Sequence, residues 1–244
     1  INNLGYSQSA CNRYNNLLLK SAGIIVFSDR QKEFVAEHLS QVKNKIYVFR
    51  MGLNSLEKPV CKNSSCGIRI SLSGGTRPIK RNKFVINAIN QIQNVHGPIT
   101  VFIYGDATSD RETWVDTTLR NGKIVFRGQL EHSLFCKELS QTDLFIMASL
   151  HESFGISAID AVQAGVNILI SEKCGVAEVF ELLPGDVIYE SDSEKDLAAK
   201  IEKVLQTPNN NRLRNSIDYK KYNWEHSVRE FRKSISSDLL QANH

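Results

Sequence analysis

The sequence predicts an α/β protein: a Rossmann-like, doubly wound parallel sheet with helices on both faces, preceded by a small βα segment. Short runs rich in β-branched residues alternate with amphipathic stretches along most of the chain, and this alternation is typical of βαβ units. Several runs, such as residues 144–148, are apolar at every position, as expected for strands that helices cover on both faces. The length of 244 residues indicates between one and two domains of about 150 residues.

Eight strands are predicted where β-branched and aromatic residues cluster. In chain order they are residues 23–27, 45–49, 68–71, 99–104, 123–126, 144–148, 166–170 and 186–189. Seven helices are predicted from apolar residues spaced three and four positions apart. In chain order they are residues 30–39, 80–93, 131–140, 156–164, 176–183, 193–206 and 223–241.

Local signals support several of these boundaries. Asp29 precedes the first predicted helix in a cap-like position. Gly165 follows residues 156–164 where a helix commonly ends. The run Asn209–Asn211 after Pro208 is interpreted as a loop.

A turn-rich stretch separates two parts of unequal size. Residues 51–59 follow a predicted strand and are interpreted as a linker. Residues 1–50 hold only two predicted strands and cannot easily bury a sheet alone, whereas residues 60–222 form a block large enough for its own core. Residues 223–244 are predicted to form a C-terminal helix.

Composition excludes several classes of protein. With 41% hydrophobic and 23% charged residues, the chain is neither disordered nor fibrous. The net charge of +4 is too small to indicate a nucleic-acid partner. The apolar runs are far shorter than the ~20 residues of a membrane-spanning helix, and no leader pattern opens the sequence. We expect a cytoplasmic protein. The mildly basic net charge favours at most peripheral contact with a membrane surface.

The loop after the third predicted strand has the composition of an anion site. Gly74 and Gly75 let a ligand approach the backbone and its N–H groups, and the start of the next helix favours negative charge. Arg77, Lys80 and Arg81 add positive charge where a phosphate would lie. The loop matches neither a Walker sequence nor Gly-x-Gly-x-x-Gly. The alternative is a glycine turn followed by solvated basic residues.

The loop after the sixth predicted strand carries two carboxylates. Glu152 lies just before a predicted helix, and Asp160 lies eight positions later, about two turns down that helix. The two groups can therefore meet different parts of an elongated ligand. The residues between them that can present unbonded N–H groups are Ser153, Phe154, Gly155 and Ile156. Taken singly, each carboxylate has a simpler explanation. Glu152 would be a partner of the helix dipole, and Asp160 would be a solvated residue within the helix.

Smaller features end other strands. Gly105 ends the fourth predicted strand, and Gly128–Leu130 ends the fifth, where backbone groups around a glycine can read the edge of a base. Cys61 and Cys66 lack the second pair or histidine cluster that a tetrahedral metal site needs. We therefore expect no bound metal.

The order of these motifs resembles the C-terminal domain of retaining GT-B glycosyltransferases of the group 1, or family 4, type. The family signature is a Glu, a Gly-Phe-Gly-like turn and a second Glu eight positions after the first. Here Glu152, Ser153-Phe154-Gly155 and Asp160 take those places. Further matches lie at Asp143, Ser149, Ala161, Gly165 and Glu178. The resemblance begins near residue 24, so residues 1–50 resemble only the last part of an incomplete N-terminal domain.

The resemblance implies a function for each motif. Residues 60–222 would bind a nucleotide-diphosphate sugar and transfer the sugar, with retention, to a glycan or lipid-linked acceptor. Glu152 would be the catalytic residue, facing the donor sugar near the reacting carbon, and Asp160 would hold the ribose hydroxyls. Lys80 would bind the diphosphate. The other donor-binding residues would be Gly74, Gly75, Arg77, Arg81, Gly105, Gly128, Gln129, Leu130, Ser153, Phe154, Gly155 and Ile156. No metal or other cofactor is implied, because basic residues and helix N-termini would neutralise the leaving diphosphate.

Two departures from the family pattern affect donor binding. Asp160 is one methylene shorter than the usual Glu, so its ribose contact would be longer or bridged by water. Gly75 stands where an Arg commonly lies, and Arg77 or Arg81 would supply that charge from a shifted position.

Other interpretations stay open. The chain would alternatively be a non-catalytic nucleotide-sugar-binding subunit, or a truncated relic, that needs a partner chain. A GT-B-shaped epimerase would need paired acid and base residues in one cleft, which the sequence does not locate. Residues 224–231 resemble the family's last helix, which returns to brace the first domain, although a helix packed on its own domain explains them equally well.

Overall fold

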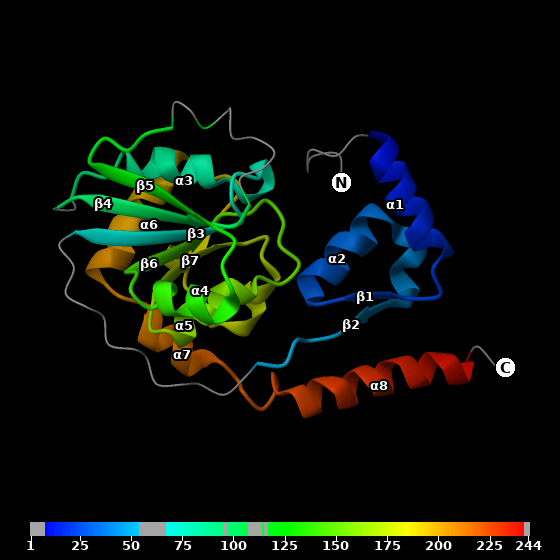
Figure 1. The fold of residues 1–244 in the computed structure, drawn as a ribbon. Coiled ribbons are helices and arrows are strands. Elements are labelled where there is room, and N and C mark those ends of the chain that lie inside the picture. Colours follow the sequence, from blue (N-terminus) through cyan, green and yellow to red (C-terminus); the bar gives the residue numbers. More distant parts are fainter. Residues whose placement is uncertain (1–7, 54–66, 95–96, 107–113, 115–116, 242–244) are drawn as a thin grey trace.

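The computed structural model describes residues 8–53, 67–94, 97–106, 114 and 117–241. Within them, a sheet of six parallel strands forms a larger part and a sheet of two parallel strands a smaller part (Figure 1). The predicted α/β fold is therefore confirmed. Cys61, Cys66 and most of the predicted linker lie outside the described residues, and Met51–Leu53 have no regular structure.

The six strands lie in the spatial order β5, β4, β3, β6, β7 and β8, and every neighbouring pair is parallel. Their bounds are β3 Ile68–Ser73, β4 Ile99–Tyr104, β5 Gly122–Gly128, β6 Leu144–Met147, β7 Asn167–Ser171 and β8 Val187–Ile188. The chain enters at β3, winds outward through β4 and β5, and then returns to the other side of β3 through β6. This is the doubly wound order, in which ligands bind beyond the carboxyl ends of the two central strands.

Helices cover both faces of this sheet (Figure 1). One face carries α3 (Asn82–Ile89) and α6 (Glu194–Gln206), and the other carries α4 (His132–Leu139), α5 (Ile156–Gln163) and α7 (Asn210–Ser216). Side chains of a strand point alternately to the two faces. Accordingly, in β6 Phe145 belongs to the core under α5 and Ile146 to the core under α3. Burial on both faces explains why this strand is apolar throughout.

The smaller part is a two-stranded parallel sheet with its own helices. It holds α1 (Gln8–Lys20), β1 (Ile24–Val26), α2 (Asp29–His38) and β2 (Ile46–Val48). Its apolar cluster is formed by Ile24, Val26, Leu39, Val42 and Ile46. This cluster is much smaller than either of the two clusters that flank the six-stranded sheet.

The C-terminal helix α8 (Trp224–Gln241) runs along this smaller part (Figure 1). The ring of Phe49 lies 6.5 Å from that of Trp224 and 5.1 Å from that of Phe231, between centroids. The chain thus crosses back to brace its N-terminal segment, which decides between the two interpretations of this helix. None of the described helices is both long and apolar enough to cross a lipid bilayer.

The eight predicted strands are all found, but the helix predicted at residues 176–183 is wrong. Only a short 3-10 helix forms, at Gly175–Val179. The amide of Gly175 donates to the carbonyl of Glu152 at 3.0 Å, and that of Val176 donates to Phe154 at 2.6 Å. These bonds dock the start of the segment, whose first amides would be unpaired in a helix in any case. The chain is extended at Phe180 (φ −111°, ψ 149°), and the amide of Glu181 donates to the Ser216 hydroxyl at 3.1 Å, so no α-helix continues through residues 180–183. The second predicted helix also starts later than expected, because Arg81 adopts a left-handed conformation (φ 54°) before α3 begins at Asn82.

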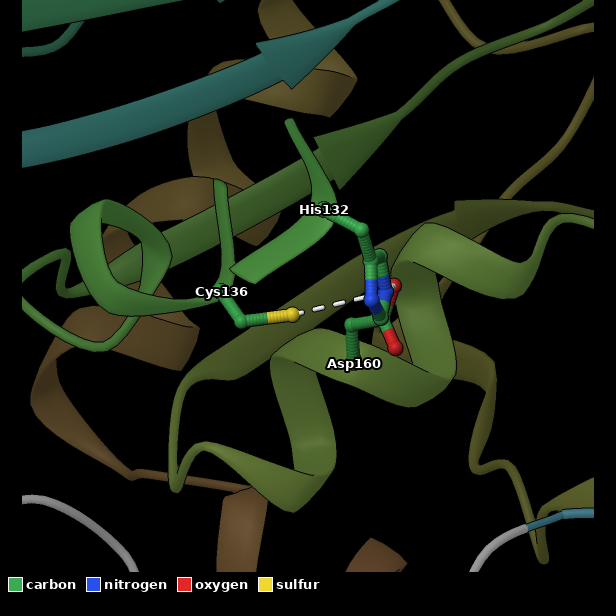
Figure 2. Close-up of side chains that lie close together, drawn as sticks. All are labelled: His132, Cys136 and Asp160. Carbon is green, nitrogen blue, oxygen red and sulfur yellow. Dashed lines mark hydrogen bonds and ion pairs between the residues drawn. The ribbon is translucent and has the colours of Figure 1, made fainter. Parts of the chain in front are cut away.

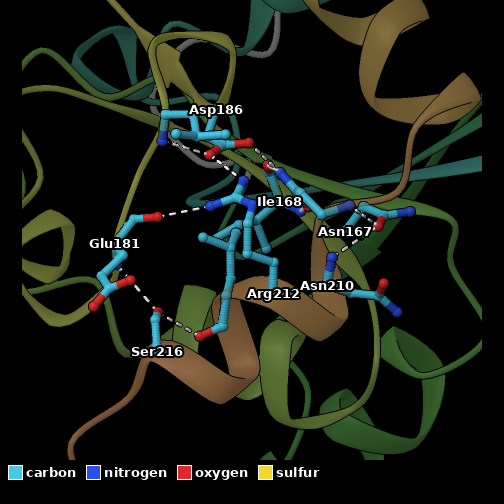
Figure 3. Close-up of polar contacts among 10 residues, drawn as sticks. Asn167, Ile168, Glu181, Asp186, Asn210, Arg212 and Ser216 are labelled. Atoms are coloured by element: carbon cyan, nitrogen blue, oxygen red, sulfur yellow. Dashed lines mark hydrogen bonds and ion pairs between the residues drawn. The ribbon is translucent and has the colours of Figure 1, made fainter.

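The loop predicted at Asn209–Asn211 is wrong in part: Asn209 precedes α7 as its N-cap, but Asn210 (Figure 3) and Asn211 form the start of the helix. Asn209 is buried, and its amide group donates to the carbonyl of Ile168 and to Asp186, both at 2.8 Å. Its backbone N–H donates to Asn167 at 3.0 Å. Arg212 forms an ion pair with Asp186 in the same network. Asparagines of a type that is common in loops therefore anchor the start of α7 to β7.

Candidate functional site

The loops that follow the two central strands meet at the carboxyl edge of the sheet. The amide of Leu150, after β6, donates to the carbonyl of Ile79, after β3, at 2.9 Å. Next to this bond, the ammonium of Lys80 forms an ion pair with the carboxylate of Glu152. The two side chains are only 12% and 20% exposed, so the pair is largely shielded from solvent. The structure thus brings together the two charged residues to which the sequence assigned diphosphate binding and catalysis.

The glycine loop before Lys80 is held tightly by its neighbours. The amide of Gly75 donates to Tyr104 at 2.8 Å, and its carbonyl accepts from the side chain of Asn82 at 2.8 Å. Gly75 has φ +64°, a conformation that L side chains rarely adopt. The aliphatic stem of Lys80 lies directly over Gly74, where a Cβ would collide with it. The absence of a side chain at Gly74 therefore leaves room for Lys80 to reach Glu152, and its absence at Gly75 lets the loop approach the backbone of Asp106.

The segment from Glu152 to Ile156 presents a row of amides. In the part of the chain that the structure describes, no backbone N–H of Ser153, Phe154, Gly155 or Ile156 donates to another protein group. The carbonyls on the other side of the segment are occupied: Glu152 accepts from Gly175, and Ser153 accepts from the Ser28 hydroxyl at 3.1 Å. The segment is fixed through its carbonyls, so its N–H groups and the start of α5 remain available to an anion.

Asp160 lies farther along α5, with a side chain only 10% exposed. Burial raises its pKa, and the nearby His132 opposes that shift. The Nε2 atom of His132 lies 3.2 Å from the carboxylate. His132 and its helix neighbour Cys136 were not predicted as site residues. The signal for them is the approach of His132 to Asp160, 28 positions away in the chain, which no sequence pattern indicates.

The remaining predicted residues lie along the same edge. Gly105 donates its amide to the carbonyl of Gly128 at 2.7 Å, which joins the ends of β4 and β5. Gln129 is exposed and Leu130 partly buried, beyond β5. They lead directly into α4 and so lie two or three positions before His132.

The two predicted arginines do not join the Lys80–Glu152 pair. Arg77 is exposed and donates to the carbonyl of Gly74 at 3.2 Å. Arg81 stacks over the ring of Phe84, with its guanidinium 4.0 Å from the ring centroid. Burial lowers the pKa of Arg81. In this structure each guanidinium thus contacts its own loop or helix rather than Glu152.

Glu178 and His151 connect the smaller part to this edge. Glu178 accepts from the amide of Asp29 at 3.0 Å, so it caps α2 rather than its own 3-10 helix. Burial raises the pKa of Glu178. The ring of His151 packs on Phe34 of α2 at 4.5 Å between centroids, and burial lowers its pKa. The first turn of α2 is therefore docked beside Glu152.

Fold and site together define a doubly wound domain of the kind found in GT-B glycosyltransferases. The chain belongs to the family of glycosyl transferases group 1, whose family model matches residues 70–224. This match covers β3 to the start of α8, and so includes Lys80, Glu152 and Asp160.

Similar proteins of known sequence are distant. The chain is 22% identical over 232 residues to an uncharacterised glycosyltransferase of Methanocaldococcus jannaschii, covering 86% of this chain and 59% of that protein. It is 23% identical over 198 residues to the glycogen synthase of Mycobacterium tuberculosis, covering 79% of this chain and 47% of the synthase. The chain thus spans about half the length of the curated relatives it matches.

Solved structures resemble the chain over nearly its whole length. Anabaena HepE in complex with UDP and glucose superposes with a TM-score of 0.71 at 17% identity, covering 95% of this chain and 68% of HepE. A mutant of Staphylococcus aureus TarM in complex with fondaparinux, α-GlcNAc-glycerol and UDP gives a TM-score of 0.73 at 18% identity, covering 94% of this chain and 47% of TarM. These likenesses establish the fold.

Proposed function

We propose that this chain carries the donor-binding part of a retaining glycosyltransferase, which moves a sugar from a nucleotide-diphosphate sugar to a glycan or lipid-linked acceptor. The observation that carries the proposal is the shielded ion pair of Lys80 and Glu152 between the two central strands. Family membership supports a transferase, and the UDP in the HepE and TarM complexes supports the kind of donor.

Lys80 is the proposed diphosphate ligand. When the donor binds, the ammonium exchanges the carboxylate of Glu152 for a phosphate oxygen. The amides of residues 153–156 and the positive end of α5 add further stabilisation for an anion. As the bond between the sugar carbon and the diphosphate breaks, these groups stabilise the charge that develops on the leaving diphosphate. The ammonium of Lys80, these amides and the start of α5 are the reason for proposing a metal-independent reaction.

Glu152 is the proposed catalytic residue. Released from Lys80, its carboxylate lies at the carboxyl edge of the sheet, where the donor sugar would place its reacting carbon. Asp160 is the proposed ribose ligand, buried on α5 and held in place by His132. The two carboxylates thus bind opposite ends of the donor.

The acceptor side is proposed to involve the domain to which residues 1–50 belong. Ser28 and Phe34 of this segment contact Ser153 and His151, the neighbours of Glu152 in the chain. Asp29 contacts Glu178 on the adjacent 3-10 helix. Since the chain spans only part of its relatives' length, we propose that acceptor contacts come from further residues of the same protein or from a partner chain.

Calorimetry with UDP-, GDP- and ADP-sugars, followed by product analysis, tests the proposal. Glu152→Gln is expected to abolish turnover while nucleotide affinity stays within about threefold. Lys80→Ala removes a charge-assisted contact of about 1.5–3 kcal/mol, so nucleotide affinity is expected to fall roughly 10- to 100-fold. Lys83→Ala, whose ammonium lies over the Trp114 ring, is the matched control and should leave affinity unchanged.

The outcomes separate the alternatives. Binding without turnover for any acceptor mixture would support a non-catalytic subunit. No binding to any of the three nucleotides would refute both functions. Where turnover is found, NMR of the anomeric proton in the product tests retention, and turnover in EDTA tests metal independence.

A further inference from the structure

Three side chains capable of binding a metal converge between α4 and α5 (Figure 2). His132 and Cys136 lie four positions apart on α4 and hence on one face of that helix, and Asp160 faces them from α5. The Nε2 atom of His132 lies 3.2 Å from Oδ2 of Asp160 and 3.5 Å from Sγ of Cys136. One ligand atom of each residue lies within 4.8 Å of the other two. A nitrogen, a sulfur and an oxygen ligand therefore surround one point.

The spacing of these atoms fits tetrahedral zinc. Zinc bonds of about 2.0–2.3 Å to nitrogen, oxygen and sulfur place neighbouring ligand atoms about 3.3–3.8 Å apart. The distance of 3.5 Å from His132 to Cys136 lies within this range, and the distance of 3.2 Å from His132 to Asp160 lies just below it. Sγ of Cys136 and the carboxylate of Asp160 also lie within 4.8 Å of each other, and a bound zinc ion would hold them at its own spacing.

The chemistry of the ligand set selects the metal. Imidazole, thiolate and carboxylate together suit zinc, whereas magnesium and calcium take oxygen ligands. A deprotonated Cys136 and Asp160 carry two negative charges, which balance the two positive charges of the ion. The side chain of His132 is 70% exposed, so a water molecule can reach the fourth coordination position.

We propose that His132, Cys136 and Asp160 form a zinc site whose occupation excludes the donor nucleotide. Zinc takes the carboxylate of Asp160, to which the proposed function assigns the ribose hydroxyls, and it lies beside the Gly128–Leu130 loop assigned to the base. The inhibitory effect rests on the proposed function, whereas zinc binding does not. Because coupling between two ligands is reciprocal, the nucleotide lowers the affinity for zinc by the factor by which zinc lowers the affinity for the nucleotide.

Metal binding is tested first, without nucleotide. The metal-free chain is titrated with Co²⁺, whose absorption reports a thiolate ligand, and with Zn²⁺ against a chromophoric chelator. We expect one ion per chain and a thiolate-to-cobalt band. Cys136→Ser is expected to remove the band, and both Cys136→Ser and His132→Ala should weaken zinc binding by more than about 100-fold, since even residues behind a ligand contribute 10- to 100-fold. The double variant Cys61→Ser/Cys66→Ser is the control and should bind zinc like the wild type.

Two results of this titration would overturn the site. The first is the absence of saturable binding. The second is a cobalt band that persists in Cys136→Ser or disappears in the Cys61→Ser/Cys66→Ser control, because the thiolate would then belong to another part of the chain. Circular dichroism of each variant shows that a loss of binding does not reflect unfolding.

Competition is tested second, with UDP, GDP or ADP, whichever binds the zinc-free protein. With free zinc held constant by a metal buffer, saturation of the site is expected to weaken nucleotide affinity at least 10-fold in the wild type and to leave Cys136→Ser unaffected. Equal affinity with and without zinc in the wild type would overturn the inhibitory role. If no nucleotide binds the zinc-free protein, the proposed function fails, while the cobalt spectrum still decides the metal site.

Discussion

Replacement of Gly75 by alanine tests how tightly the loop before Lys80 is fixed. Gly75 has φ +64°, a left-handed conformation that costs an L residue about 1–2 kcal/mol. A Cβ at this position would also overlap the carbonyl oxygen of Asp106 and lie 2.7 Å from its carbonyl carbon. Both atoms belong to the backbone, so the collision cannot be relieved by a side-chain rotation. The two loops after β3 and β4 must therefore move apart.

The cost of this movement follows from the bonds it breaks. Thr76 donates to the carbonyl of Asp106 at 3.2 Å, and Gly75 donates to Tyr104 at 2.8 Å. Each bond contributes about 1 kcal/mol, so their loss adds about 2 kcal/mol to the conformational cost. We expect Gly75→Ala to lower the free energy of unfolding by about 3–4 kcal/mol.

Gly128 offers a matched control on the same edge of the sheet. Its φ is +68°, but a Cβ there would meet nothing within 4 Å. Gly128→Ala should therefore pay only the conformational cost of about 1–2 kcal/mol. Urea unfolding measures both variants; with a slope near 2 kcal/mol per M, their midpoints should differ by about 1 M. Equal midpoints would refute the argument that backbone contact, rather than φ alone, fixes this glycine.

Two further predictions concern residues that the sequence misjudged or left unassigned. Asn209→Ala removes three side-chain hydrogen bonds, with Ile168 and Asp186, and should lower the free energy of unfolding in urea by about 3 kcal/mol. Asn211→Ala, at an exposed position in the first turn of α7, should change that free energy by less than about 0.5 kcal/mol. Similar losses for both variants would contradict the anchoring role. Burial lowers the pKa of His151 below its ordinary value of 6.5, so the unfolded chain binds this proton more readily and stability falls as the pH drops from about 7 through the folded pKa. His151→Asn should flatten that part of the stability profile, and an unchanged slope would show that other groups cause it.

Much of the fold follows from the sequence because its strand signals are local and strong. The run at residues 144–148 is apolar at every position, and the structure buries β6 on both faces. Glu152 and Lys80 follow two strands in sequence, and the rule that ligands bind at the carboxyl edge was sufficient to expect them on that edge. Their direct ion pair depends on β3 and β6 being neighbours, which strand patterns alone do not specify.

The wrong predictions share one physical cause. The segment at residues 176–183 has a helical pattern, but the chain is extended at Phe180, and the amide of Glu181 donates to the Ser216 hydroxyl instead. Asn209 has the composition of a loop, but β7 supplies partners for its side chain. In each case a tertiary hydrogen bond overrides a local preference worth only a fraction of a kcal/mol per residue.

The sequence by itself determined the α/β class, the strands, and the loops that carry Lys80, Glu152 and Asp160, because each depends on residues adjacent in the chain. Tertiary structure alone decided which side chains touch across those loops. It placed His132 and Cys136 against Asp160, and it used Glu178 to cap a helix 149 positions away. Such contacts are set by strand order and helix packing, whose geometry brings together residues between which the sequence contains no pattern.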